Sequence, residues 1–252
     1  MNLAHREDGD PDAPAVLLSP SLGTTWEMWD ELTSVLAPTH RVVRYDTRGH
    51  GRSPVPDGPY AMTDLADDVV ALADSLGIDR FAFVGLSLGG AIGQTLAISH
   101  GARLTALVLC CTLPSLGEPS AWHERAAQVR AEGMEVLAEP TRGRWFTDAF
   151  RASHPEQVDR FIAMLTSTPV EGYAGCCEAL AGFDSWSDIQ RIDVPCRVVA
   201  AAQDPVCPPS GCAEMAAAIP GADLVVIDDA SHMAAVAQPA AFHATVAEHL
   251  HR

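Results

Sequence analysis

The chain has 252 residues, enough for one large α/β domain or two small ones, and 48% of them are hydrophobic, which supplies a sizeable core and argues against disorder. The net charge of −17 argues against nucleic acid and anionic membranes as partners. No apolar run approaches the length of a membrane span, and the acidic N-terminal segment lacks the features of a signal peptide. We therefore expect a cytoplasmic protein; composition does not predict its oligomeric state.

The cysteines and the basic residues narrow the chemistry further. The seven cysteines are odd in number and form no Cys-x-x-Cys pair, so we interpret them as reduced thiols that mostly fill the core. None has a cluster of histidines or cysteines beside it, so we assign no metal and no cofactor. All 16 basic residues are arginine, and any anionic substrate needs one of them nearby to offset the general repulsion.

The first predicted strand covers residues 15–18 and leads into a loop at residues 19–24, which contains a glycine and has no helical period. One interpretation is a plain connection from strand to helix. The other is the loop that lies beside the nucleophile in an α/β hydrolase and supplies a backbone amide to an oxyanion. Counting back from Met28 and Trp29, we place that amide on Leu22.

A helical spacing follows at residues 29–36, then a strand at residues 41–45 and a turn at residues 46–53 that is rich in Asp, Arg and His. We interpret this turn as structural, because its Asp and Arg side chains can tie their own backbone, and we do not take His50 as the catalytic histidine. Residues 63–76 then form an amphipathic helix that ends at a glycine.

Residues 81–84 form a buried strand that runs into Gly-x-Ser-x-Gly at residues 85–89 and a helix from residue 91. This order predicts a nucleophile elbow, a sharp turn that leaves no room for side chains at the two glycines and exposes the hydroxyl of Ser87. The amide of Leu88 then points to where an oxyanion forms. The alternative is a tight glycine turn with a bystander serine.

After a strand at residues 104–109 the character of the sequence changes. Residues 114–185 lack a strong strand signal and contain helical pieces at residues 122–131, 134–138, 158–165 and 172–180. We expect a helical cap here, inserted into a main domain of residues 1–113 and 186–252, that roofs the site and excludes water. The aromatic cluster Arg144-Trp145-Phe146 either packs within this cap or faces the substrate.

The sheet resumes with strands at residues 197–202 and 224–227, and a terminal helix begins at Pro239. Strands that alternate with helices predict a mostly parallel sheet with helices on both faces. Asp204 follows the first of these strands and His232 the second. The chain order serine, acid, histidine is that of an α/β hydrolase, so we assign a triad to Ser87, Asp204 and His232.

Other residues compete for the acid and base roles. Asp228 and Asp229 lie too near His232 in the chain and follow the wrong strand. Among the other histidines, His5, His249 and His251 lie near the termini, His243 lies on the last helix, and His123 and His154 lie in the expected cap. We therefore retain Asp204 and His232.

The triad implies a role for each group. His232 takes the proton from Ser87 and later gives it to the leaving oxygen, while Asp204 orients the imidazole. The amides of Leu22 and Leu88 bind the oxyanion, and a water activated by His232 releases the acyl group.

Several motifs make the chain resemble the 3-oxoadipate enol-lactonases, α/β-hydrolase enzymes of the β-ketoadipate pathway, from about residue 12 to the end. They are Ser21-Leu22-Gly23-Thr24, Met28-Trp29-Asp30, Arg44-Tyr45-Asp46-Thr47-Arg48-Gly49-His50-Gly51, Gly58-Pro59-Tyr60, Gly85-Leu86-Ser87-Leu88-Gly89-Gly90 and Trp145-Phe146. The resemblance implies an α/β-hydrolase fold and an enzyme of aromatic catabolism that opens the enol-lactone ring to 3-oxoadipate through an acyl-enzyme on Ser87. That substrate carries a carboxylate, for which Arg144 beside Trp145 is our candidate partner, with Arg125 as another.

The chain also departs from the family pattern. Pro20 stands where the family has Asn, and the chain begins almost at the family's second strand, so we expect the sheet to lack its first strand. The cap, which decides the substrate, is the least similar part. Three other functions fit the same scaffold: a carboxylesterase or another lactonase, a cofactor-free perhydrolase or haloperoxidase, and a ligand receptor without turnover.

Overall fold

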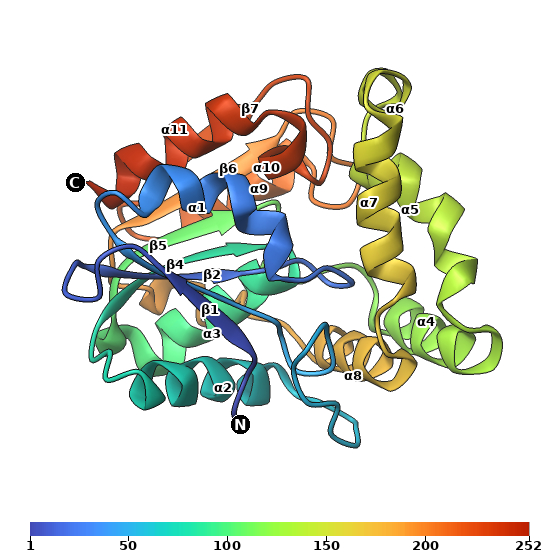
Figure 1. Cartoon of the computed structure of the whole chain (residues 1–252), viewed down its shortest axis with the longest axis horizontal. Coiled ribbons are helices and arrows are strands. Elements are labelled where there is room, and N and C mark those ends of the chain that lie inside the picture. The colour runs from blue at the N-terminus through green and yellow to red at the C-terminus, as the bar shows by residue number, and fades with distance from the viewer. Residues whose placement is uncertain (252) are drawn as a thin grey trace.

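A single mixed sheet forms the centre of the computed structural model, which describes residues 1–251 (Figure 1). Within those residues the sheet has seven strands in the order β1-β3-β2-β4-β5-β6-β7. The strands are β1 (His5–Asp8), β2 (Ala15–Ser19), β3 (Arg41–Tyr45), β4 (Phe81–Leu86), β5 (Leu104–Cys110), β6 (Cys196–Ala201) and β7 (Asp223–Ile227). Only β1 runs antiparallel to its neighbour, and every other pair is parallel.

The six parallel strands confirm the sequence prediction to within two residues at each end, because each contains an apolar run, which is largely buried in every strand except the edge strand β7. β1 was not predicted. Its sequence, His-Arg-Glu-Asp, has no apolar alternation, and the strand lies at the sheet edge, where charged side chains are common. Ion pairs hold it there: Arg44 of β3 binds Asp8, and Arg41 binds Glu7.

Helices cover both faces of the sheet, as the alternating pattern predicts. Helices α1 (Asp30–Leu36) and α11 (Pro239–Leu250) lie on one face, and α2 (Met62–Ser75) and α3 (Leu88–His100) lie on the other (Figure 1). Trp29 and Phe242 are fully buried, and their rings, 6.2 Å apart, join the first pair of helices. The remaining helical segments of this part are α9 (Pro209–Ala218), α10 (Ala234–Ala237), η1 (Trp26–Trp29), η2 (Gly101–Arg103) and η4 (Ile189–Arg191).

Between β5 and β6 the chain forms only helices, which lie beyond one end of the sheet (Figure 1). We call these helices the cap. They are α4 (Pro119–Glu132), η3 (Met134–Leu137), α5 (Ala138–Trp145), α6 (Asp148–Ser153), α7 (Pro155–Thr166) and α8 (Val170–Ala181). The sequence patterns located α4, η3, α7 and α8. They missed α5 and α6, and also α9 outside the cap, because these helices are short or carry Pro, Gly and small residues in place of an apolar stripe.

No helix in residues 1–251 is both long enough and apolar enough to cross a membrane. All seven cysteines are free and buried, as core-filling thiols would be.

Candidate active site

Ser87 lies at the turn between β4 and α3, with φ 58° and ψ −111°. This left-handed φ is rare for a residue with a side chain and is typical of a strained, functional turn. A Cβ on Gly85 would lie 2.1 Å from the carbonyl oxygen of Gly89, and one on Gly89 would lie 2.4 Å from that of Ser19. Both glycines of the motif are therefore required by the close approach of backbone, which is the geometry that the motif predicts.

Hydrogen bonds on both sides of Ser87 hold the strained turn in place. Its amide donates to the carbonyl of Cys110 at 2.9 Å, and its carbonyl accepts from the hydroxyl of Thr112 at 3.0 Å. A Cβ on Gly90 would lie only 2.5 Å from Cγ2 of Thr112, which explains the second glycine after the serine. The end of β5 thus fixes the turn.

His232 and Asp204 form a buried pair in the loops after β7 and β6. Nδ1 of His232 lies 2.8 Å from Oδ2 of Asp204, and the amides of Val206 and Cys207 donate to Oδ1 of the same carboxylate. Burial opposes ionisation of Asp204, but attraction to His232 and these hydrogen bonds outweigh it, so the pKa of Asp204 lies below its ordinary value. The ionised carboxylate only accepts, so Nδ1 carries the proton and Nε2 is free to act as a base.

A cavity of about 260 Å³ brings these groups together. Ser87 and His232 both line it, and Asp204 lies behind the imidazole. The cap supplies much of the opposite wall, including all three residues that the sequence put forward for substrate binding: Arg125, Arg144 and Trp145. The cavity is large enough for a small organic molecule. Polar groups that follow the carboxyl ends of the strands line one side of it, and aromatic side chains of the cap line the other.

The loop after β2 leaves one backbone amide free at the cavity. On either side of Leu22, the amide of Ser21 donates to Sδ of Met28 at 3.3 Å and that of Gly23 donates to Nε2 of His50 at 3.0 Å. The amide of Leu22 has no acceptor in the part of the chain that the structure describes, and Leu22 lines the cavity. This is the amide that the sequence put forward as an oxyanion donor.

The second expected donor, the amide of Leu88, is the first of helix α3. The first amides of an α-helix have no acceptor within the helix, and the helix dipole adds positive potential at that end. Leu88 follows Ser87 directly, so this amide and that of Leu22 belong to the two segments next to the hydroxyl. These two amides remain the candidate donors for a developing oxyanion.

Arg125 and Arg144 differ from almost all other arginines of the chain. Within residues 1–251, every arginine except Arg80, Arg125 and Arg144 forms an ion pair, and the last two line the cavity. Burial and the charge of Arg125 lower the pKa of Arg144. Arg125 stacks over the ring of Trp122 at 4.8 Å. Among the described residues, the cavity therefore contains two positive charges that form no ion pair, and the exposed Glu118 is the one acidic residue in its lining.

Other cavity residues were not predicted, among them Trp122, Thr141 and Tyr173. They come from three cap helices, and no local motif marks them, since only the packing of the cap brings them to the site.

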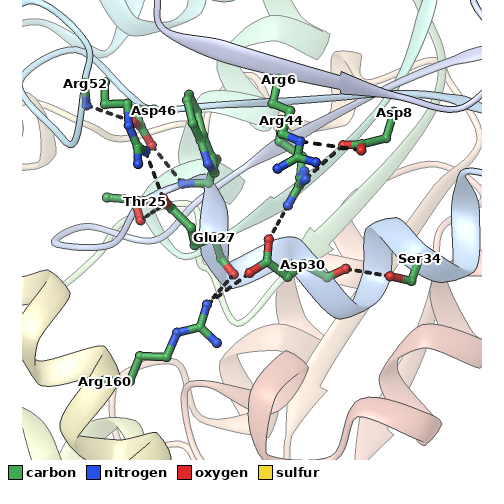
Figure 2. A network of polar contacts seen from close by, with 11 residues as sticks. Arg6, Asp8, Thr25, Glu27, Asp30, Ser34, Arg44, Asp46, Arg52 and Arg160 are labelled. Carbon is green, nitrogen blue, oxygen red and sulfur yellow. Dashed lines mark hydrogen bonds and ion pairs between the residues drawn. The ribbon is translucent and has the colours of Figure 1, made fainter.

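In the turn at residues 46–53, Asp46 ties the backbone as expected, since it accepts from the amide of Arg52 (Figure 2) and also from that of Trp26. The arginine part of the prediction is wrong: the side chains of Arg48 and Arg52 bind Asp68 and Glu27, outside the turn. The histidine of this turn, His50, accepts a hydrogen bond from the amide of Gly23 in the loop after β2, a contact that the sequence did not indicate.

Asp204, Cys207 and His232 lie close enough to suggest a metal centre, with one ligand atom of each within 4.8 Å of the others. Two observations argue against that interpretation. The carboxylate oxygens already accept three hydrogen bonds, and burial together with Asp204 raises the pKa of the Cys207 thiol well above its ordinary value, which opposes a thiolate ligand. The hydrogen bonds of an acid–histidine pair account for the arrangement.

A family model described as the alpha/beta hydrolase fold matches residues 14–238, and the chain therefore belongs to the α/β-hydrolase family. It is 41% identical over 238 residues to 3-oxoadipate enol-lactonase 2 of Acinetobacter baylyi, covering 94% of this chain and 89% of that relative. The chain resembles two solved structures over 99% of its length. These are the enol-lactonase from Burkholderia xenovorans LB400 (39% identity, TM-score 0.97, 96% of that chain) and a thermophilic esterase from Thermogutta terrifontis with malate bound (31%, 0.94, 93%). The expected family is confirmed, and the protein is a carboxylic ester hydrolase.

Proposed function

We propose that this hydrolase opens the ring of 3-oxoadipate enol-lactone to give 3-oxoadipate, through an acyl-enzyme on Ser87. The observation that carries the proposal is the pair of arginines without ion pairs, Arg125 and Arg144, in the cavity that Ser87 and His232 line. The enol-lactone is an ester with a carboxylate, and this cavity offers a nucleophile for the first group and positive charge for the second. The similarity to enol-lactonases from two organisms supports the same substrate.

The proposed reaction begins at the lactone carbonyl. His232 accepts the proton of Ser87 at Nε2, Oγ bonds to the carbonyl carbon, and Asp204 stabilises the imidazolium through Nδ1. The amides of Leu22 and Leu88 hold the resulting oxyanion. One such donor is worth about 3–4 kcal/mol of barrier.

Collapse of this intermediate breaks the ring C–O bond and leaves an enol oxygen on the same molecule as the acyl group. His232 gives its proton to that oxygen, and the enol becomes a ketone, which removes the nucleophile that would close the ring again. A water activated by His232 then cleaves the ester to Ser87 and releases 3-oxoadipate. The chain needs only these residues and water for the sequence of steps.

The carboxylate of the substrate meets a protein whose net charge of −17 repels it. Two guanidinium groups that form no ion pair in residues 1–251 place positive charge in the cavity, which Trp145 also lines. The related esterase that was solved with malate bound held a dicarboxylate, which fits an anion-binding site in this group of enzymes. We further propose that residues 114–185 act as a cap that encloses the substrate above a core of residues 1–113 and 186–252.

The test compares the anionic enol-lactone with neutral p-nitrophenyl acetate, using wild type, Arg144→Gln and Arg125→Gln. We expect wild type to prefer the enol-lactone, and each variant to lose about tenfold or more in kcat/KM on it while changing little on the ester. Arg80→Gln is the matched control, because Arg80 also lacks an ion pair in residues 1–251 but bonds the carbonyl of Leu104 away from the cavity. A preference for the neutral ester, with arginine variants that affect both substrates equally, would indicate a carboxylesterase or another lactonase instead.

A further inference from the structure

His50 lies in the turn after β3 and is 1% exposed. Its Nδ1 lies 3.2 Å from the carbonyl oxygen of Arg48, and its Nε2 lies 3.0 Å from the amide nitrogen of Gly23. A carbonyl only accepts and an amide only donates, so Nδ1 carries the proton and Nε2 accepts from Gly23. The two contacts fix one neutral tautomer, and burial supports it by lowering the pKa of His50 to about 4.

The hydrogen bond between His50 and Gly23 is one of several contacts that fix the loop after β2. Gly23 has φ +76°, and a Cβ there would lie 2.4 Å from Cδ1 of Leu165 in the cap. The amide of Ser21 is held by Sδ of Met28. The imidazole holds the amide after Leu22 and the methionine holds the amide before it, so the peptide that carries the Leu22 N–H is fixed at both ends.

We propose that His50 is a positioning residue for the oxyanion site: its Nε2 binds the Gly23 amide and thereby keeps the Leu22 amide directed into the cavity. This inference rests on the proposed function in one respect, since it requires an oxyanion to form at Ser87. It does not depend on which ester is the substrate. Without the acceptor, the peptide between Leu22 and Gly23 loses this restraint. The alignment of the Leu22 donor then depends on the hydrogen bonds that Ser21 forms with Thr24 and Met28.

Two isosteric substitutions separate the contacts of the imidazole. In His50→Gln the side-chain oxygen takes the place of Nε2 and still accepts from Gly23. In His50→Asn the side chain reaches only the position of Nδ1, so it retains a partner for Arg48 and loses the bond to Gly23. Both variants are neutral and polar, so comparison between them isolates the contact with the loop.

The experiment measures kcat and KM for p-nitrophenyl acetate and the inhibition constant of phenylboronic acid, which forms a tetrahedral anion on a serine hydroxyl. For His50→Asn we expect kcat/KM to fall about tenfold or more, mainly through kcat, and the boronic acid to bind more weakly by a similar factor. For His50→Gln we expect a loss of at most about threefold in both. His243→Gln is the matched control, because His243 is a buried histidine on α11 away from the cavity.

Melting temperatures of all variants separate this role from general stabilisation. The inference is overturned if His50→Asn retains wild-type kcat and boronic acid affinity, or if His50→Gln loses as much of both as His50→Asn does. Failure of the proposed substrate would look different: wild type would hydrolyse the ester and ignore the enol-lactone, and the His50 comparison would stand on the ester alone. If Ser87→Ala retained ester hydrolysis, Ser87 would not be the nucleophile, and the inference about His50 would be overturned as well.

Discussion

Gly172 of cap helix α8 and Gly49 of the turn after β3 touch through their backbones: a Cβ on Gly172 would lie 1.9 Å from the carbonyl oxygen of Gly49. His50, which follows Gly49, accepts a hydrogen bond from the amide of Gly23 in the loop that carries Leu22. The cap, this turn and the loop that carries Leu22 therefore pack as one continuous unit. We therefore expect a displacement of α8 to shift the loop that carries Leu22.

Replacing Gly172 tests how tightly the cap and the turn fit. Gly172→Ala forces backbone apart, and we expect a loss of about 3 kcal/mol in the free energy of unfolding together with reduced kcat. Gly143→Ala is the control in another cap helix, α5, where a Cβ would meet nothing within 4 Å. There we expect a gain of about 0.5–1 kcal/mol, since alanine is the better helix former. Urea unfolding measures both, and equal effects would show that the close approach has no energetic weight.

The buried His50 makes stability depend on pH. Its pKa is about 4 in the folded chain and 6.5 for an ordinary histidine, so between these values the unfolded chain binds more protons than the folded one. The free energy of unfolding therefore falls as the pH falls from about 6.5 to about 4, by about 3 kcal/mol from this group.

His50→Gln lacks that titration, which makes it the reference. We expect the stability of wild type relative to His50→Gln to decline by that amount across the same pH interval in urea unfolding experiments. A difference between the two proteins that stays constant with pH would contradict a neutral, buried His50.

The polar network in Figure 2 contains two arginines whose replacement we expect to affect stability to different extents. Arg44 is buried and binds both Asp8 and Asp30, whereas Arg160 of the cap is half exposed and shares only Asp30 (Figure 2). Arg44→Met removes the buried partner of Asp8 and Asp30, which in residues 1–251 keep only the exposed partners Arg6 and Arg160. We expect a loss of about 2–3 kcal/mol in the free energy of unfolding. Arg160→Met removes an exposed pair worth less than about 1 kcal/mol, and high salt should abolish that difference. Equal losses for the two variants would show that burial does not set their contributions.

Asp204→Asn tests the orientation of the candidate base. The amide keeps the shape of the side chain but offers Nδ1 of His232 the wrong partner or the wrong tautomer, and it removes the charge that stabilises the imidazolium. We expect kcat to fall by about three to four orders of magnitude, with little change in melting temperature. Retention of more than a tenth of wild-type kcat would exclude Asp204 as the triad acid.

The parallel strands and the elbow could be predicted because their signals are local: apolar runs such as residues 81–84, and glycines at positions 85 and 89 where any Cβ would strike backbone. β1 could not, since its place at the edge depends on backbone pairing with β3 and on Arg44 and Arg41, which lie far along the chain.

The residues of the candidate site also divide into those with a local sequence signal and those that depend on contacts between distant parts of the chain. Ser87, Asp204 and His232 follow strand ends, where a parallel sheet gathers them. Tyr173 and Trp122 reach the cavity only through the packing of cap helices. The sequence pattern assigned His50 to a structural turn; its contact with Gly23 spans 27 residues and leaves no trace in local spacing.

The central claim is that Ser87 attacks the lactone, and Ser87→Ala tests it most directly. The measurement is the initial rate of hydrolysis of freshly prepared 3-oxoadipate enol-lactone by wild type and by the variant, at equal protein concentration and with melting temperatures to show that both are folded. We predict rapid turnover by wild type and a loss of at least about a thousandfold in the variant. A folded Ser87→Ala protein that hydrolyses the enol-lactone at the wild-type rate would contradict this account.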